Sequence, residues 1–163
     1  MPSKKEFDII IEGLEEESKF YGEIYDKWEH IALEEMTKFG KLVEEGAKSL
    51  AFHDTGEFED SITSDPAIRE GDGVSVEIGS NSPLAVTLHE RPYRMGTHDK
   101  YDNGARFPRY YVNGRGRRTI TKPKWRGFKA GRKYMQNAVT AVEPDLDKMN
   151  ERIQQRVFEN RGK

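Results

Sequence analysis

Apolar residues recur every three or four positions through the first fifty residues of the chain. The series begins at Phe7 and ends at Leu50, and many acidic residues lie at the intervening positions. This spacing is the period of one face of an α-helix. It predicts one or two amphipathic helices over residues 4–50, with a Glu-rich face in solvent and a capping box formed by Ser3 and Glu6 at the start.

Short segments separated by turns follow this helical region. Residues 61–63 are typical of extended chain, and residues 74–78 alternate apolar and polar side chains, as half-buried strands do. Residues 84–89 form a short apolar run that is compatible with a strand or a short helix, and its length and β-branched residues favour a strand. These segments predict a small, mostly antiparallel sheet.

Residues 91–126 show no long periodic segment and contain repeated Gly and Pro. A stretch of this length without regular structure is usually functional or disordered. Asn113-Gly114 is a strong signal for a hairpin turn, because both residues tolerate a positive φ. We therefore expect an extended Arg-rich β-hairpin over residues 109–121, forming an arm inserted at 91–126.

Helical spacing returns after the arm. Residues 127–142 and 145–160 each predict a helix, with Pro144 between them. The apolar stripe of the last helix is narrow, which suggests docking on a neighbouring subunit. The expected architecture is α+β: a long N-terminal helix packed on the sheet, the arm, and C-terminal helices. One domain covers residues 1–143, and residues 144–163 form a helical extension.

The composition limits the classes of protein that this chain can represent. Only 34% of its 163 residues belong to the group AVILMFWYC, and the mean hydropathy is −0.89, which favours burial completed by a partner or by self-assembly. The absence of Cys excludes disulfides, Cys-ligated metals and thiol nucleophiles. There is no apolar run of the ~18 residues that a membrane span needs and no signal-peptide pattern. We expect a soluble protein made inside the cell.

The net charge of −2 conceals a strong asymmetry along the chain. Residues 1–60 carry a net charge of −10, residues 61–90 carry −4, residues 91–136 carry +12, and residues 137–163 are neutral. Basic residues of the arm alternate with aromatic ones, which is typical of nucleic-acid binding. The same arm is also suited to the Glu-rich helices of a neighbouring subunit, and a solvated flexible loop is a third interpretation. The candidate contact residues are Arg106, Arg109, Tyr110, Tyr111, Arg115, Arg117, Arg118, Lys122, Lys124, Trp125 and Arg126.

Two arrangements resemble catalytic or metal sites. His89, Glu90, His98, Asp99 and Asp102 match no ligand motif such as H-E-x-x-H, and we expect polar loop residues there. His53, Asp54 and Ser61 contain the residue types of a hydrolase triad, but three such residues within ten positions are common by chance. The sequence therefore predicts no catalytic residue, no metal and no cofactor.

Four phrases, taken in order, resemble a family of tailed-bacteriophage neck proteins, also called tail-completion, head–tail joining or minor tail proteins. The first phrase, residues 51–62, is similar to A-x-x-D-T-G-x-L-x-x-S-I, with Phe58 in place of the usual Leu. The second, 76–80, is similar to V-x-I-G-[ST]. The third, 83–90, is similar to a "PYA…HE" segment, and the fourth, 131–138, is similar to G-x-K-[FY]-[LM]-x-x-A. The arm and the segment after Pro144 depart from the family pattern.

This resemblance implies a virion structural protein of the head–tail junction, made in the host bacterial cytoplasm and acting by assembly without chemistry. It implies a ring of about six or twelve copies, built through heterologous interfaces, that contacts connector and tail-tube or tail-terminator proteins. Contact with packaged DNA is also implied. The motif residues are then structural, with Gly56 expected at positive φ in a polar turn. They are Asp54, Thr55, Gly56, Ser61, Gly79, His89 and Glu90.

Overall fold

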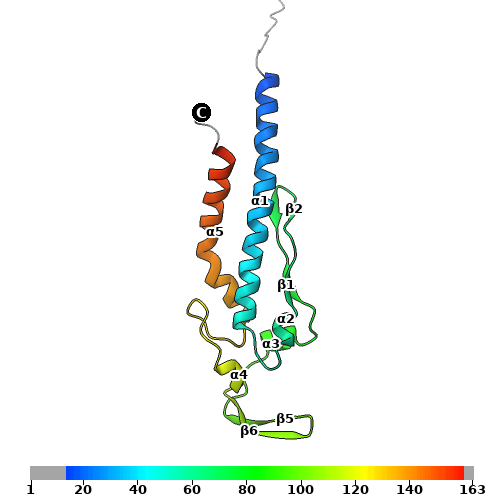
Figure 1. Cartoon of the computed structure of the whole chain (residues 1–163), viewed down its shortest axis with the longest axis vertical. Coiled ribbons are helices and arrows are strands. Elements are labelled where there is room, and N and C mark those ends of the chain that lie inside the picture. The colour runs from blue at the N-terminus through cyan, green and yellow to red at the C-terminus, as the bar shows by residue number, and fades with distance from the viewer. Residues whose placement is uncertain (1–13, 160–163) are drawn as a thin grey trace, which may run out of the picture.

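The structure is a computed structural model that describes residues 14–159 of the chain. It confirms the expected α+β class. Helices α1 (Leu14–Leu50) and α5 (Tyr134–Phe158) lie antiparallel, and small antiparallel sheets accompany α1 (Figure 1). The expected helix over residues 4–50 is a single helix where the structure describes it, and the expected capping box at Ser3 and Glu6 lies outside the described residues.

Ten short elements connect the two long helices within the described part of the chain. In chain order they are α2 (Glu57–Asp60), β1 (Ile62–Ser64), β2 (Ile68–Glu70), β3 (Gly73–Ser75), β4 (Ile78–Ser80), α3 (Ala85–Glu90), β5 (Thr97–Asp102), β6 (Ala105–Val112), β7 (Arg115–Gly116) and α4 (Arg117–Ile120). The strands form three sheets, in which β1 pairs with β4, β2 with β3, and β5, β6 and β7 follow one another. The single strand expected at 74–78 is wrong, because this segment is divided between β3 and β4.

The narrow apolar stripe of α5 packs on α1 of the same chain. Met149, Ile153 and Val157 are buried against Ile31 and Ala32. The suggestion that this stripe docks on a neighbouring subunit is therefore wrong. Two helices that each carry a narrow apolar stripe bury both stripes when they pack against each other.

A charged cluster reinforces the contact between α1 and α5. Glu35 is buried, and its carboxylate accepts hydrogen bonds from Arg152 at 2.8 Å and Arg156 at 2.9 Å. The neighbouring carboxylate of Glu34 pairs with Arg156 and Lys38, which lowers its pKa to about 2. Glu34 and Glu35 of α1 are thus paired with arginines of α5 rather than with the arm.

Residues 84–89 form helix α3 rather than the strand that we expected. The amide of Ala85 donates to the carbonyl of Ser82, and the amide of Leu88 donates to the carbonyl of Leu84. Pro83 precedes the helix, a position at which its fixed φ favours helical turns. Leu88 packs on the core while Val86 is exposed, so the helix has one apolar face. A run of six residues is too short for this helical spacing to be recognised in the sequence.

The two expected C-terminal helices are one helix, α5, which begins at Tyr134. Residues 127–133 are not helical, because Gly127, Gly131 and Lys133 adopt positive φ values of 89°, 145° and 61°. Lys133 is the residue before the first turn, so the chain enters the helix from a left-handed conformation. The expected start at residue 127 is wrong for this reason.

Helix α5 continues through Pro144, where we expected a break. A proline inside a helix removes one backbone hydrogen bond and bends the axis, and α5 changes direction in its first half (Figure 1). Val142 and Met149, on either side of the proline, are buried and hold both halves in place. The expected boundary between residues 143 and 144 falls inside this helix.

Candidate interaction site

The arm contains a β-hairpin made by β5 and β6, and this hairpin lies at the opposite end of the molecule from the first turns of α1 (Figure 1). Its turn is Asn103-Gly104, with φ values of 48° and 77°. This dipeptide has the same turn chemistry as Asn113-Gly114, and it was the available sequence signal for the hairpin. The expectation missed it because the flanking strands are mostly exposed and lack apolar alternation.

The hairpin expected over residues 109–121 is only partly correct. Asn113 and Gly114 do form a turn, with φ values of 48° and 80°, and β7 pairs with the end of β6. However, β7 has only two residues, and the chain then forms the short helix α4. The long expected second strand is therefore wrong. Gly114 lies against Tyr93, so that a Cβ at this position would come within 2.6 Å of the tyrosine.

The turn of Asp54, Thr55 and Gly56 fastens the arm to the body of the protein. Gly56 has φ 99°, as expected for this turn. The Asp54 carboxylate accepts hydrogen bonds from the Lys100 ammonium at 2.5 Å and from the Tyr110 hydroxyl at 3.2 Å. We call this set of contacts between Asp54, Lys100 and Tyr110 the arm latch.

Electrostatics favours the closed arm latch. The hydrogen bond from Lys100 lowers the pKa of Asp54, and the same carboxylate raises the pKa of Lys100. Burial, followed by the nearby Asp54 charge, raises the pKa of the Tyr110 hydroxyl, so Tyr110 remains a donor at neutral pH. The Lys100 ammonium also lies 5.0 Å from the centre of the Tyr110 ring. All three groups therefore hold the protonation states that the latch requires.

Several arginines of the candidate contact set also brace the arm. Arg117 donates to the carbonyls of Pro108 and Arg109, and Arg118 donates to the carbonyl of Asp54. Their guanidinium groups satisfy backbone acceptors at the base of the hairpin. Arg106 forms an ion pair with Asp99 within the hairpin at 2.7 Å. The hydrogen bond from the backbone N–H of Arg109, followed by that from Arg106, lowers the pKa of Asp99.

Lys122 has a structural role that the sequence analysis missed. Its ammonium donates to the carbonyls of Lys48 and Ala51 at the C-terminal end of α1, at 2.8 and 2.9 Å, and to Glu59 at 2.7 Å. The last carbonyls of a helix have no partner inside the helix, and a cation satisfies them. The side chains of Lys122 and Glu59 are each only 15% exposed, so this lysine is not available to another molecule.

Trp125 and the remaining arginines of the candidate set are also used within the chain. Trp125 packs against Gly46 of α1, and Arg126 lies over the Trp125 ring while pairing with Asp145. Arg115 donates to the carbonyl of Ala130 at 3.4 Å. The indole ring is therefore part of the core rather than a free platform for stacking bases.

Five exposed cations of the basic region make no side-chain hydrogen bond or ion pair within residues 14–159. They come from the segments on both sides of the hairpin and from its second strand. They are Arg91, Arg94, Arg109, Lys124 and Lys129. Tyr101 and Phe107 of the hairpin are exposed with them. These exposed side chains of the basic region are available for contact with a partner.

The remaining motif residues are structural in their contacts. The Ser61 hydroxyl donates to the carbonyl of Phe58 and contacts the Ser80 hydroxyl, both at 2.6 Å, while Gly79 lies in β4. His89 contacts Glu90 at 2.7 Å, and the pairing of Glu90 with Lys133, followed by His89, lowers the pKa of Glu90. The ion pair between Glu90 and Lys133 fastens the end of α3 to the residue before α5.

The structure separates the groups of the imagined triad and metal site. The His53 ring faces Glu59 at 2.7 Å, Ser61 faces the Phe58 carbonyl, and Asp54 belongs to the arm latch. His98 contacts the carbonyl of Met95. Among residues 14–159, no group of three or more His, Cys, Asp or Glu side chains is arranged to hold a metal ion.

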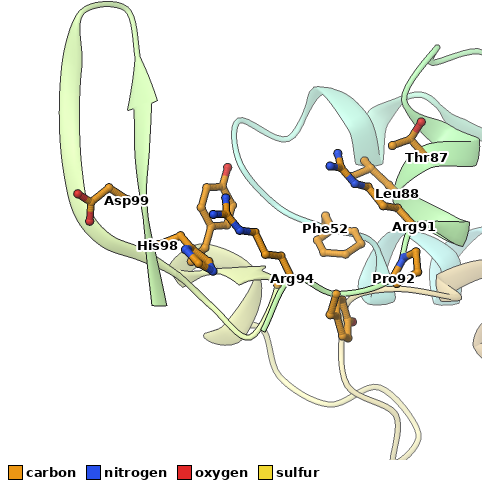
Figure 2. Close-up of a pocket in the computed structure, with 11 residues that line it drawn as sticks. Phe52, Thr87, Leu88, Arg91, Pro92, Arg94, His98 and Asp99 are labelled. Atoms are coloured by element: carbon orange, nitrogen blue, oxygen red, sulfur yellow. The ribbon is translucent and has the colours of Figure 1, made fainter. Parts of the chain in front are cut away.

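Two neighbouring hollows lie between the arm and the body. The first, of about 340 Å³, lies between the end of α3 and the hairpin, and the second, of about 410 Å³, borders the Asp54 turn. Phe52, Leu88 and Tyr111 line both, so the hollows adjoin, and we call the two together the arm groove. Figure 2 shows Phe52 in the middle of the first hollow, with Arg91 on the α3 side and Arg94 on the hairpin side.

Comparison with known proteins gives no relative for this chain. No protein family, curated protein or solved structure matches it. The described helices also include none that is long and apolar enough to cross a membrane.

Proposed function

We propose that this chain is a structural virion protein of the head–tail junction, which forms a ring that joins or completes the tail and lets DNA pass. The observation that carries the proposal is the meeting of the four resembling phrases in one core. Phe58 and Ile62 of the first phrase, Ile78 of the second, Leu88 of the third and Tyr134 of the fourth all belong to the same apolar cluster. The phrases thus have packing roles in one core, which agrees with the structural role that the resemblance implies for them.

The distribution of charge supports the ring. Acidic side chains of the first turns of α1, such as Glu16, Glu17 and Glu23, are exposed at one end of the molecule, and the arm is at the other (Figure 1). A molecule with two different, complementary ends forms heterologous contacts, and such contacts close into rings when the rotation permits. The proposed partners are copies of this chain, connector proteins on the head side, and tail-tube or tail-terminator proteins.

Mass photometry and negative-stain electron microscopy of the purified chain, alone and with tail components, test this proposal. We expect a ring of about six or twelve copies whose assembly weakens at high salt, because exposed charge pairs are screened. A ring that appears only with tail components also supports the proposal. A chain that stays monomeric and never joins particles refutes it.

Nucleic-acid binding is the second candidate function. It is supported by the five exposed cations that make no side-chain hydrogen bond or ion pair within residues 14–159, and by the exposed rings of Tyr101 and Phe107. The test replaces Arg109, Lys124 and Lys129 by Ala, because these side chains do not brace the arm. A nucleic-acid interface predicts salt-dependent affinity for DNA that falls in this variant. A variant with Arg117→Ala and Arg118→Ala is the control for loss of arm position. Affinity that is independent of salt and unchanged in the triple variant contradicts this function.

A further inference from the structure

The arm groove has the composition of a binding site rather than of a packing defect. Its first hollow of about 340 Å³ falls within the range of roughly 300–1,000 Å³ that is common for ligand sites. Phe52, Tyr93 and Tyr111 supply aromatic walls, and Arg91 and Arg94 stand at its edge.

The first hollow of the arm groove is positively charged, whereas Asp54 and Glu57 line the second hollow. Neither Arg91 nor Arg94 has a carboxylate partner among the described residues. Asp99 is the one acidic residue in the lining of the first hollow, and its charge is already matched by Arg106. An occupant that combines bulky apolar side chains with carboxylates would satisfy both features, because arginine binds carboxylates through paired hydrogen bonds.

One segment of this chain has that chemistry. Residues 6–12 read Glu-Phe-Asp-Ile-Ile-Ile-Glu, with three carboxylates around Phe7 and three isoleucines, and they lie outside the described residues. We infer that the first hollow of the arm groove of one copy binds residues 6–12 of a second copy. The inference rests on the proposed function, since it names a contact that would connect successive copies in the ring.

The length of α1 requires this contact to be made between two chains. The helix has 37 residues, so at 1.5 Å per residue Leu14 lies about 55 Å from Leu50, close to which Phe52 lines the groove. The seven residues from Phe7 to Leu14 span at most about 25 Å when fully extended. Phe7 therefore cannot reach the groove of its own chain.

A nearer hollow competes for the same segment and provides the alternative outcome. Tyr21, Ile24, Trp28 and Val157 line an apolar hollow of about 370 Å³ between α1 and α5. It is close to the start of α1, but exposed acidic residues such as Glu17 accompany it on the same helix. Like charges near this hollow oppose an acidic segment, whereas the arginines of the arm groove attract it.

Binding of a labelled peptide of residues 6–12, with both ends blocked, tests the inference by fluorescence anisotropy. The acceptor is the full chain carrying Phe7→Ser and Ile10→Ser, so that its own segment does not compete. We expect saturable binding that weakens about tenfold in an acceptor that also carries Arg91→Ala and Arg94→Ala, because charge-assisted hydrogen bonds are lost. The matched control, Lys124→Ala with Lys129→Ala, removes the same charge outside the groove and should change the affinity less than about twofold.

Two results would overturn the inference. One is the absence of saturable binding at millimolar peptide. The other is binding that survives the two arginine substitutions but is lost in an acceptor with Trp28→Ser, which would assign the segment to the hollow between α1 and α5. A chain that forms rings without binding the peptide refutes this inference alone. A chain that binds the peptide but never joins particles refutes the proposed function alone.

Crosslinking provides an independent readout, since the natural chain has no Cys. Chains with Ile10→Cys are mixed with chains carrying Thr87→Cys, at the edge of the groove, or Thr140→Cys, an exposed position on α5. We expect a crosslinked pair of chains with the first partner and a much lower yield with the second. Equal yields with both partners contradict the inference.

Discussion

Replacing Asp54 by Asn tests whether the arm latch holds the arm against the body. The substitution keeps the shape of the side chain but removes the charge that the Lys100 ammonium contacts at 2.5 Å. Asp102 provides the matched control, because it contacts the same ammonium from a distance of 3.5 Å. Both carboxylates are about half exposed, but only Asp54 is close to Lys100 and also accepts the Tyr110 hydroxyl.

The expected magnitude follows from the geometry of the latch. A hydrogen bond to a charged group contributes roughly 1.5–3 kcal/mol when it is shielded from water. The Asp54 side chain is 50% exposed, so solvent reduces the contribution of the latch to about 1 kcal/mol. This corresponds to a roughly fivefold increase in the population with a detached Lys100.

Acetylation of lysines, followed residue by residue with mass spectrometry, measures this change. In the wild-type chain Lys100 is 13% exposed and its pKa is raised by Asp54, and both effects slow its reaction. We expect Asp54→Asn to accelerate acetylation of Lys100 by about fivefold or more, and Asp102→Asn by less than about twofold. Lys124, which is exposed, serves as the internal reference. An unchanged rate in Asp54→Asn, or equal acceleration in both variants, would refute the latch.

Three further predictions concern stability, measured by chemical denaturation. The ammonium groups of Lys41 and Lys48 lower the pKa of Glu44 to about 2 from an ordinary 4.5. The free energy of unfolding should therefore fall as the pH drops from 4.5 to 2, and it should fall less steeply in Glu44→Gln. Equal slopes in the two proteins contradict this prediction. Lys122→Met should lower the free energy of unfolding by about 2 kcal/mol, because it leaves two backbone carbonyls and the Glu59 carboxylate without their cation. The control, Lys124→Met, should lower it by less than about 0.5 kcal/mol. Equal losses contradict the capping role of Lys122. Gly46→Ala should destabilise by about 1–3 kcal/mol, because its Cβ would lie 2.5 Å from an indole carbon. Gly22→Ala, in open space on the same helix, should stabilise by roughly 0.5–1 kcal/mol, and the reverse order would refute the packing described.

Features that depend on local spacing could be predicted from the sequence. The long series of apolar residues at helical spacing, ending at Leu50, predicted α1. The turns at Gly56 and Asn113-Gly114 have the positive φ values that their residue types favour. These features are decided within a few residues of the chain. Local propensity and the final structure therefore agree there.

Features that depend on contacts distant in sequence could not be predicted. Lys122 looked like one more cation of a basic arm, and only the fold brings it to the carbonyls of Lys48 and Ala51, more than seventy residues away. In the same way, Trp125 resembled a stacking residue until the structure placed it against Gly46. A charge count along the chain assigns cations to a segment but does not distinguish those that brace the fold from those that remain free.

The separation of the charged ends of the molecule has a consequence for how the protein behaves on charged surfaces. The arm segment 91–126 carries a net charge of +9, and the first turns of α1 are acidic, while the whole chain has a net charge of −2. Ions screen charge beyond about 8 Å at physiological ionic strength, far less than the length of α1 of about 55 Å. The electrostatic interaction of each end with a nearby charged surface is therefore independent of the charge at the other end. Anion-exchange and cation-exchange media should both retain the protein near neutral pH, each holding it by a different end.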